Sequence, residues 1–237
     1  MKKLLAVFAH PDDETFGPGA TLAKYASKGV VVDVVMATRG EAGENHVNDK
    51  TGKELGKIRE KELRAADKIL GVNQIDLLGF VDGELRQNIY FDIAKKIITK
   101  IKSFRPDVIV TFEPHGVSGH LDHIAISFIT TYAYFQTEIP KKLYYICLSE
   151  KVRNSRDQNY FVYFPDGYPE GQITTKIDVA DYWDKKLKAM LSHKTQIKDV
   201  KRLIAMFNTM PKVDNYILKY HRLKGLRLPE DDLFNGI

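Results

Sequence analysis

Near its start the chain reads LLAVFAHPDDE, residues 4–14. The apolar run Leu4–Ala9 has the length and composition of a buried β-strand, and it stops at a cluster of titratable side chains. Ligands bind beyond the carboxyl ends of the strands in open α/β sheets. If this strand belongs to such a sheet, His10, Asp12 and Asp13 lie where chemistry is expected.

Strand-like and helix-like segments alternate over the first 150 residues. The expected strands are Leu4–Ala9, Val30–Met36, Ile75–Phe80, Asp107–Phe112 and Leu143–Leu148, and the expected helices are Pro18–Lys28, Glu54–Leu70, Asn88–Phe104 and His120–Gln136. This alternation predicts parallel strands joined by right-handed crossovers. We therefore expect an α/β fold with a Rossmann-like, mostly parallel sheet and helices on both faces. The loops 10–17 and 113–123 should open on the same edge of the sheet.

The pattern changes after residue 150. Asn154–Tyr160 is polar, and Pro165–Gly171 holds two prolines and two glycines, which is typical of a loop. A strand at Ile173–Val179 and helices at Tyr182–His193 and Gln196–Asn208 follow. We expect a single domain over residues 1–237, with its core in residues 1–150 and a smaller C-terminal α+β extension in residues 151–237.

Composition excludes several classes of protein. The 237 residues carry a net charge of +5 without a long Lys/Arg block, so a nucleic-acid partner is not expected. The apolar run after Lys2-Lys3 is too short for a signal peptide, and no run approaches a membrane span. The single cysteine, Cys147, lies in an apolar run, which predicts a buried thiol and a reducing compartment. We expect a cytoplasmic protein.

A second chemical cluster lies in the loop 113–123, with His120, Asp122 and His123 at the start of the fourth predicted helix. A solvated turn explains the first cluster alone, and an exposed histidine pair explains the second. Two clusters at one sheet edge instead favour a metal site. Neutral imidazoles and a carboxylate bind the ion there, and a free carboxylate accepts a proton.

The chain resembles the PIG-L or LmbE-like deacetylases, zinc enzymes that act on N-acetylglucosaminyl compounds. The segments that carry the resemblance are Ala9–Glu14, Gly19–Lys28, Thr38–Glu41, Ile58–Glu60, Leu78–Glu84, Arg105–Asp107, Gly119–His123 and, later, Lys186–Gln196. One departure is Leu121, which stands where the family usually has proline. Because proline favours the first turn of a helix, we expect a slightly less rigid segment here.

The resemblance implies roles for the two clusters. His10, Asp13 and His123 would hold Zn²⁺, with Fe²⁺ as a substitute metal. Asp12 would be the general base for a zinc-bound water. A protonated His120 would stabilise the developing oxyanion, with Asp122 holding His120.

The resemblance also implies two substrate contacts. Arg59 would grip sugar hydroxyls, and the alternative is a surface ion pair with Glu60 or Glu62. Asp82 would contact substrate, and the alternative is an ordinary turn residue in Val81-Asp82-Gly83. Other residues are less defined: Glu41 and Glu44 are candidates for shaping the pocket, His193 either reaches the site or is a half-exposed helix residue, and His46, His115 and His221 are unassigned.

These roles predict a metal-dependent hydrolase that removes the N-acetyl group from a GlcNAc-containing small molecule or conjugate. An amidase acting on a thiol conjugate and a non-catalytic metal-binding α/β module remain alternatives. A phosphoesterase would often use a second metal, and an iron oxygenase would leave Asp12 without a task. A dinucleotide-binding domain would need a glycine-rich loop where His10–Glu14 stands. The GlcNAc conjugate and self-association are left open.

Overall fold

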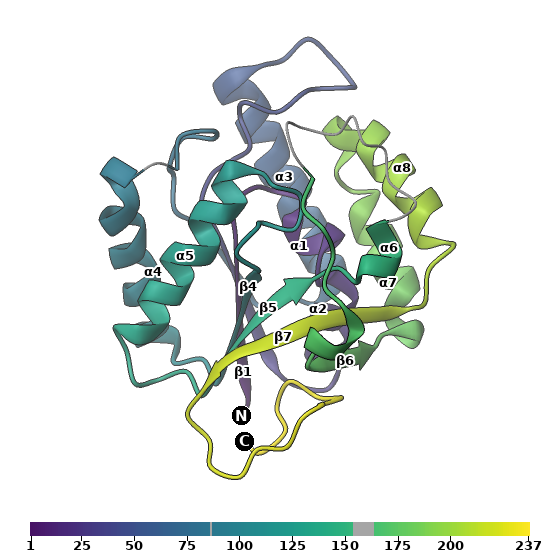
Figure 1. Ribbon diagram of the computed structural model, residues 1–237. Coiled ribbons are helices and arrows are strands. Elements are labelled where there is room, and N and C mark those ends of the chain that lie inside the picture. The colour runs from purple at the N-terminus through teal and green to yellow at the C-terminus, as the bar shows by residue number, and fades with distance from the viewer. Residues whose placement is uncertain (86, 154–163) are drawn as a thin grey trace.

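The centre of the molecule is a seven-stranded sheet with the order β3-β2-β1-β4-β5-β7-β6 (Figure 1). The computed structural model describes residues 1–85, 87–153 and 164–237, so the polar stretch Asn154–Tyr160 lies outside the described residues. The strands are β1 Lys3–Phe8, β2 Val31–Met36, β3 Gln74–Leu77, β4 Val108–Phe112, β5 Lys142–Cys147, β6 Thr175–Asp178 and β7 Val213–His221. The first five pair in parallel, and β7 runs antiparallel to both β5 and β6. The predicted mostly parallel sheet is confirmed.

Helices cover both faces of this sheet (Figure 1). On one face α4 (Tyr90–Phe104) packs beside α5 (Leu121–Phe135), and on the other α2 (Gly19–Ser27), α3 (Gly52–Leu70) and α7 (Trp183–Met190) pack together. The other helices are α1 Asp13–Phe16, α6 Glu150–Arg153 and α8 Ile197–Phe207, with 3₁₀ turns at Gln87–Ile89, Glu170–Gln172, Ala180–Tyr182 and Lys194–Gln196. The predicted α/β fold with helices on both faces is therefore present.

The hydrophobic core follows the predicted patterns. The side chains of β1 from Leu4 to Phe8 are fully buried, as expected for a central parallel strand. In α4, the isoleucines spaced by four residues, Ile93, Ile97 and Ile101, are also fully buried. Cys147 is 2% exposed, which confirms the prediction of a buried thiol.

Several elements differ from the prediction. Residues predicted as part of the loop 10–17 form the short helix α1, and β7 was not predicted at all. The buried positions of β7 include Asp214, which accepts hydrogen bonds from the backbone N–H and the hydroxyl of Thr21. A buried carboxylate among Tyr216 and Leu218 breaks the alternation that would have indicated a strand.

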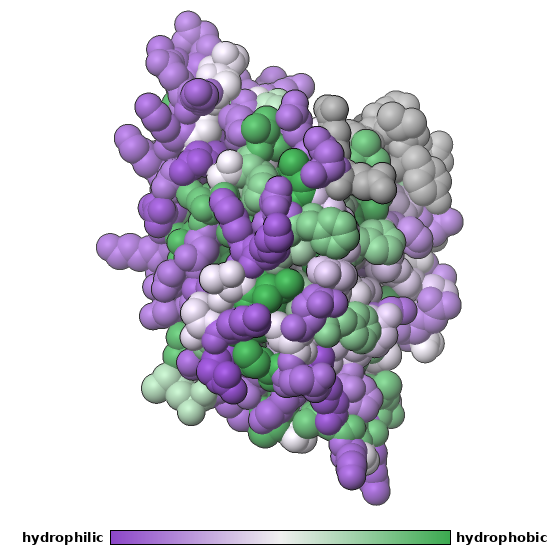
Figure 2. All heavy atoms as spheres, turned by 90° about the vertical axis from the view of Figure 1, so that its left-hand side faces the viewer, coloured by the Kyte–Doolittle hydropathy of each residue, from purple (hydrophilic) through white to green (hydrophobic). Residues whose placement is uncertain are grey.

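The face that carries α4 and α5 is mainly hydrophilic, with separate hydrophobic patches (Figure 2). Phe91, Phe128 and Phe135 each expose more than half of their surface there. Among the described residues, none of the helices has the length and apolarity needed to cross a membrane.

Sheet topology brings the two chemical clusters together. β1 and β4 are neighbours and run in parallel, with Leu4 opposite Val108 and Ala6 opposite Val110. The loops that follow them therefore leave the sheet at the same edge, as predicted. His10 follows β1, and His120 and His123 come from the loop after β4 and the start of α5.

Candidate active site

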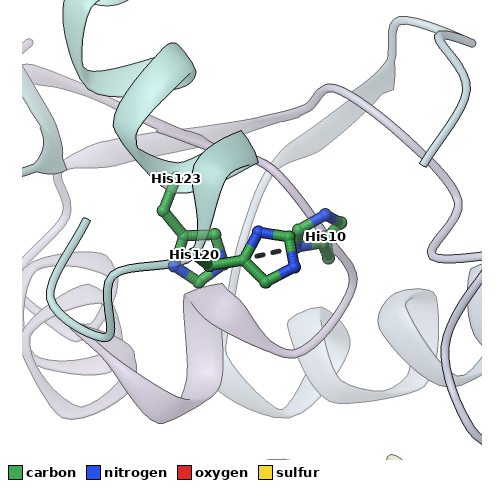
Figure 3. Close-up of side chains that lie close together, drawn as sticks. All are labelled: His10, His120 and His123. Carbon is green, nitrogen blue, oxygen red and sulfur yellow. Dashed lines mark hydrogen bonds between the residues drawn. The ribbon is translucent and has the colours of Figure 1, made fainter. Parts of the chain in front are cut away.

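Three imidazole rings meet at this edge of the sheet (Figure 3). His10 Nδ1 lies 3.2 Å from His123 Nε2, and the His120 ring packs against both. His120 is the N-cap of α5, and its Nδ1 accepts the backbone N–H of Asp122. The ligating atoms of the three histidines lie within 4.8 Å of one another, as do those of His10, Asp82 and Asp122.

Hydrogen bonds orient the two facing histidines. His123 Nδ1 lies 3.0 Å from the Gly116 carbonyl, to which it donates, so the lone pair is on Nε2. His10 Nε2 lies 2.9 Å from an Asp82 oxygen and 3.1 Å from an Asp122 oxygen, so this nitrogen carries a proton. The neutral form of His10 then has its lone pair on Nδ1. Both lone pairs point into the same space.

Asp13 completes the set. Its Oδ1 lies 3.2 Å from His123 Nε2, and its Oδ2 lies 3.8 Å from His10 Nδ1. Oδ2 also accepts the backbone N–H groups of Ala9 and His10, which hold the carboxylate in place. Ligands of a tetrahedral zinc ion with bonds of about 2.0–2.1 Å are separated by about 3.3 Å. When His10 is neutral, its Nδ1 lone pair and the Nε2 lone pair of His123 face each other, and a cation between them would satisfy both. The residues therefore fit a divalent metal ion.

The charge of the site favours a cation as well. Burial by itself would lower the pKa of His10, but the hydrogen bonds to Asp122 and Asp82 and the charge of Asp13 raise it to about 10. The surrounding carboxylates thus stabilise positive charge at this point, which a metal ion supplies when the imidazole is neutral.

Asp12 stands beside this set in a rare conformation. Its φ is 113°, in the left-handed region of backbone conformation that residues other than glycine seldom adopt. Its Oδ2 accepts a hydrogen bond of 2.9 Å from Arg59 Nη2. Burial raises the pKa of Asp12 to about 7, although the Arg59 charge opposes this. A carboxylate with that pKa is suited to accept a proton near neutral pH.

Arg59 is a buried part of the site. It is 4% exposed and also donates to the backbone carbonyls of Gly40 and Pro11. The alternative of a surface ion pair is wrong: Glu60 is bound by Arg39 and Arg64 instead, and the Glu62 carboxylate accepts from Thr195. The structure places Arg59 against Asp12. Its contact with a sugar stays a prediction.

The surroundings of His120 oppose the protonation predicted for it, which stays a prediction. Burial, together with the charges of the neighbouring His10 and His123, lowers the pKa of His120 to about 4. This shift favours the neutral ring at pH 7. Because Nδ1 accepts the Asp122 N–H, the proton of the neutral ring lies on Nε2. His120 can donate a hydrogen bond without carrying a charge.

Asp82 and Asp122 place their carboxylates on His10. Asp122 also accepts the backbone N–H groups of Gly83 and Leu85, and Asp82 accepts that of Ala42. Carboxylates on the second nitrogen of a metal-ligating histidine fix its orientation and raise its basicity. Asp82 is therefore more than a turn residue, because its carboxylate contacts His10. The Asp122 carboxylate contacts His10, and the hydrogen bond from Asp122 to His120 comes from its backbone N–H, so the predicted support of His120 by the Asp122 side chain stays a prediction.

The other candidates lie close by. Glu41 accepts the backbone N–H of Asp82, and the Glu44 carbonyl accepts from Gln196. His193 is fully buried, so the half-exposed alternative is wrong, and its Nε2 lies 3.0 Å from Glu14 Oε1. Glu14 had no predicted role. The two residues are 179 positions apart, and no local pattern in the sequence signals such a pair.

A known protein family matches the part of the chain that carries this site. Residues 5–134, more than half of the chain, match the family described as PIG-L: GlcNAc-PI de-N-acetylase. The chain belongs to the PIG-L family. The matched residues include every predicted metal ligand and Asp12, while His193 lies outside them.

This PIG-L family member aligns with its relatives over most of both chains. It is 32% identical to the 1D-myo-inositol 2-acetamido-2-deoxy-alpha-D-glucopyranoside deacetylase of Acidothermus cellulolyticus, over 100% of this chain and 96% of the relative. It is also 32% identical to the mycothiol S-conjugate amidase of Streptomyces coelicolor, over 99% and 97% of the two chains. The solved structure of N,N'-diacetylchitobiose deacetylase from Pyrococcus horikoshii has a TM-score of 0.64 at 24% identity, over 91% of this chain and 82% of that one.

Proposed function

We propose that this PIG-L family member removes the N-acetyl group from a GlcNAc-containing small molecule or conjugate, using a zinc ion held by His10, Asp13 and His123. One observation carries the proposal: two imidazole lone pairs and a carboxylate converge beside a further carboxylate, Asp12, that is not needed to hold the ion. Deacetylases of GlcNAc-containing compounds among the relatives support the substrate class. Fe²⁺ is the substitute metal that the same donors would accept.

A bound divalent ion lowers the pKa of water toward about 7 and polarises a carbonyl group. Asp12 accepts the proton of the attacking water, since burial raises the pKa of Asp12 to about 7. Arg59 holds the Asp12 carboxylate through a hydrogen bond of 2.9 Å. His120, neutral and with its proton on Nε2, donates to the acetyl oxygen as negative charge develops there.

The same residues could cleave a different amide. The amidase relative from Streptomyces coelicolor is as similar to this chain as the deacetylase, so an amide in a thiol conjugate is the second candidate substrate. Both reactions need Asp12 to take the proton of the water and pass it to the leaving amine, while His120 donates a hydrogen bond to the acyl oxygen. Substrate binding by Arg59 and Asp82 is also proposed, for either substrate.

The test compares acetate release from a panel of GlcNAc-containing compounds with amine release from a thiol-conjugate amide, in the zinc-loaded protein. Asp12→Asn should keep the metal and lose about 10²- to 10⁴-fold of turnover, the usual contribution of a general base. Asp184→Asn, a change at an exposed carboxylate on α7, is the matched control and should leave turnover intact. Unchanged turnover in Asp12→Asn would remove Asp12 as the base.

A further inference from the structure

A buried pair behind the site has no part in the chemistry described so far. Glu14 and His193 are both fully buried, and Glu14 Oε1 lies 3.0 Å from His193 Nε2. The other oxygen of Glu14, Oε2, accepts the backbone N–H of Asp12 at 2.9 Å. Glu14 therefore connects an imidazole near the C-terminal end of α7 to the main chain of Asp12.

The Asp12 main chain needs such support. Its φ of 113° is a strained conformation for a non-glycine residue, and it persists only where the surroundings enforce it. Arg59 holds the carboxylate, and the Asp12 carbonyl accepts the N–H groups of Thr15 and Phe16. The bond to Glu14 fixes the N–H side of the same residue.

We propose that Glu14 and His193 are positioning residues that hold Asp12 in the strained conformation from which its carboxylate acts. The inference rests on the proposed role of Asp12 as general base. His193 orients the Glu14 carboxylate, and Glu14 fixes the Asp12 backbone. Both are buried behind Asp12 and act through it.

The pair is not needed to attach its own segment. Thr195 donates its backbone N–H and its hydroxyl to the Glu62 carboxylate at 2.9 and 2.6 Å. Gln196 donates to the Glu44 carbonyl, and the Thr195 carbonyl accepts the N–H of His46. These bonds dock the segment after α7 onto α3 and the loop before it without the His193 ring. Loss of the ring should therefore disturb Asp12 more than the position of the segment.

The first experiment measures kcat, KM and zinc affinity for two substitutions. His193→Leu removes the donor to Glu14, and kcat should fall about 10- to 100-fold, the cost of a small misplacement of a catalytic group. KM and zinc affinity should stay close to those of the unchanged protein. His193→Gln places an N–H near the position of Nε2 and should restore most of kcat. Equal kcat for the Leu and Gln variants would overturn the proposal.

His193→Leu leaves Glu14 unpaired and buried, which can prevent folding, so a second variant avoids this problem. The double change Glu14→Met with His193→Leu replaces the buried ion pair by apolar side chains, which is often neutral for stability. It should fold, bind zinc and still show the low kcat, because the Asp12 N–H has lost its acceptor. Lys142→Met with Glu230→Leu removes another buried pair, outside the site, and should leave turnover per folded molecule unchanged. A normal kcat in the Glu14–His193 double variant would contradict the proposal.

A double-mutant cycle with Asp12→Asn separates this inference from the proposed function. If Glu14 and His193 act through Asp12, His193→Leu causes no further loss in the Asp12→Asn background. The same loss in both backgrounds would show a role independent of Asp12. Normal turnover in Asp12→Asn alone would instead defeat the proposed function itself.

Discussion

At the scale of single residues, the two ring nitrogens of His10 contact different groups of residues. Nε2 faces Asp82 and Asp122, whereas Nδ1 faces His123 and Asp13. The carboxylates on one side set the tautomer that frees the lone pair on the other. The metal affinity of the site should therefore depend on both sides of this ring.

Removing a direct ligand should abolish tight binding. In His123→Ala the Nε2 lone pair is lost, and zinc affinity should fall by more than about 100-fold, since even outer partners of ligands contribute roughly 10- to 100-fold. Competition with a chromophoric chelator measures this. His115→Ala, which changes a mostly exposed imidazole in the same loop, is the control. Full zinc occupancy in His123→Ala would mean that the ligand set is wrong.

Removing a partner of His10 should weaken binding less. Asp122→Asn keeps the shape of the side chain but loses the charge that His10 Nε2 contacts at 3.1 Å. We expect zinc affinity to fall about 10- to 100-fold. The same chelator competition measures it, with Asp92→Asn at an exposed position of α4 as the control. An unchanged affinity would show that Asp82 alone orients His10.

At the scale of elements, α3 buries charged residues as well as apolar ones. Arg59, Glu62 and Asp67 lie on its buried side with Leu63 and Leu70. Arg59 holds Asp12, and Glu62 docks the segment after α7. Asp67 differs from both: within the described part of the chain, its two carboxylate oxygens are buried without a hydrogen-bond partner. The helix α3 thus carries Arg59, which stabilises the site, and Asp67, whose buried carboxylate destabilises the fold.

This difference predicts a pH-dependent stability. Burial raises the pKa of Asp67 well above its ordinary value of 3.8, and the charge of Glu14 adds to the effect. The folded state therefore binds the proton more tightly, and its stability is lost as the pH rises from the unfolded pKa through the folded pKa. Asp67→Asn should melt higher than the unchanged protein at neutral pH, by about 2–4 °C for each 1 kcal/mol gained.

The gain should vanish at acid pH, below the unfolded pKa, where Asp67 is protonated in both the folded and the unfolded state. Thermal unfolding followed by circular dichroism from below the unfolded pKa to about pH 8 measures both ends of this range. Asp184→Asn at an exposed position of α7 should show no comparable pH-dependent gain. A lower melting temperature for Asp67→Asn at neutral pH would contradict the assignment.

At the scale of the whole molecule, the C-terminal part completes the structure begun by the first 150 residues. β7 pairs with β5, and β6 pairs with β7, so the later strands extend the same sheet. The last residues return to this sheet through Glu230, which accepts from the buried Lys142 and Tyr144. We infer one folding unit over residues 1–237.

If the chain folds as one unit, breaking the Lys142–Glu230 pair should lower global stability. Lys142→Met leaves Glu230 buried without its cation, which costs about 3–5 kcal/mol. Urea unfolding followed by circular dichroism should show one transition at a lower midpoint. Lys141→Met, at the half-exposed neighbouring position, should cost at most about 1 kcal/mol. Two separate transitions would argue against a single unit.

The sequence by itself determined the elements whose signals are local. Apolar runs predicted β1, β2, β4 and β5, and a spacing of four predicted the buried face of α4. The rule that the carboxyl ends of parallel strands meet at one edge of a sheet was enough to expect His10 and His123 close together. Their nitrogens Nδ1 and Nε2 lie 3.2 Å apart. These inferences succeed because each depends on short stretches of chain and on a regular geometry.

Only the tertiary structure decided the rest. The antiparallel strand β7, the bond from Arg59 to Asp12, the lowered pKa of His120 and the Glu14–His193 pair all depend on burial and on partners distant in the chain. A buried carboxylate hid the strand, and burial together with two neighbouring rings lowered the pKa of His120. Desolvation and long-range hydrogen bonds act only once the chain has folded, so no local pattern records them.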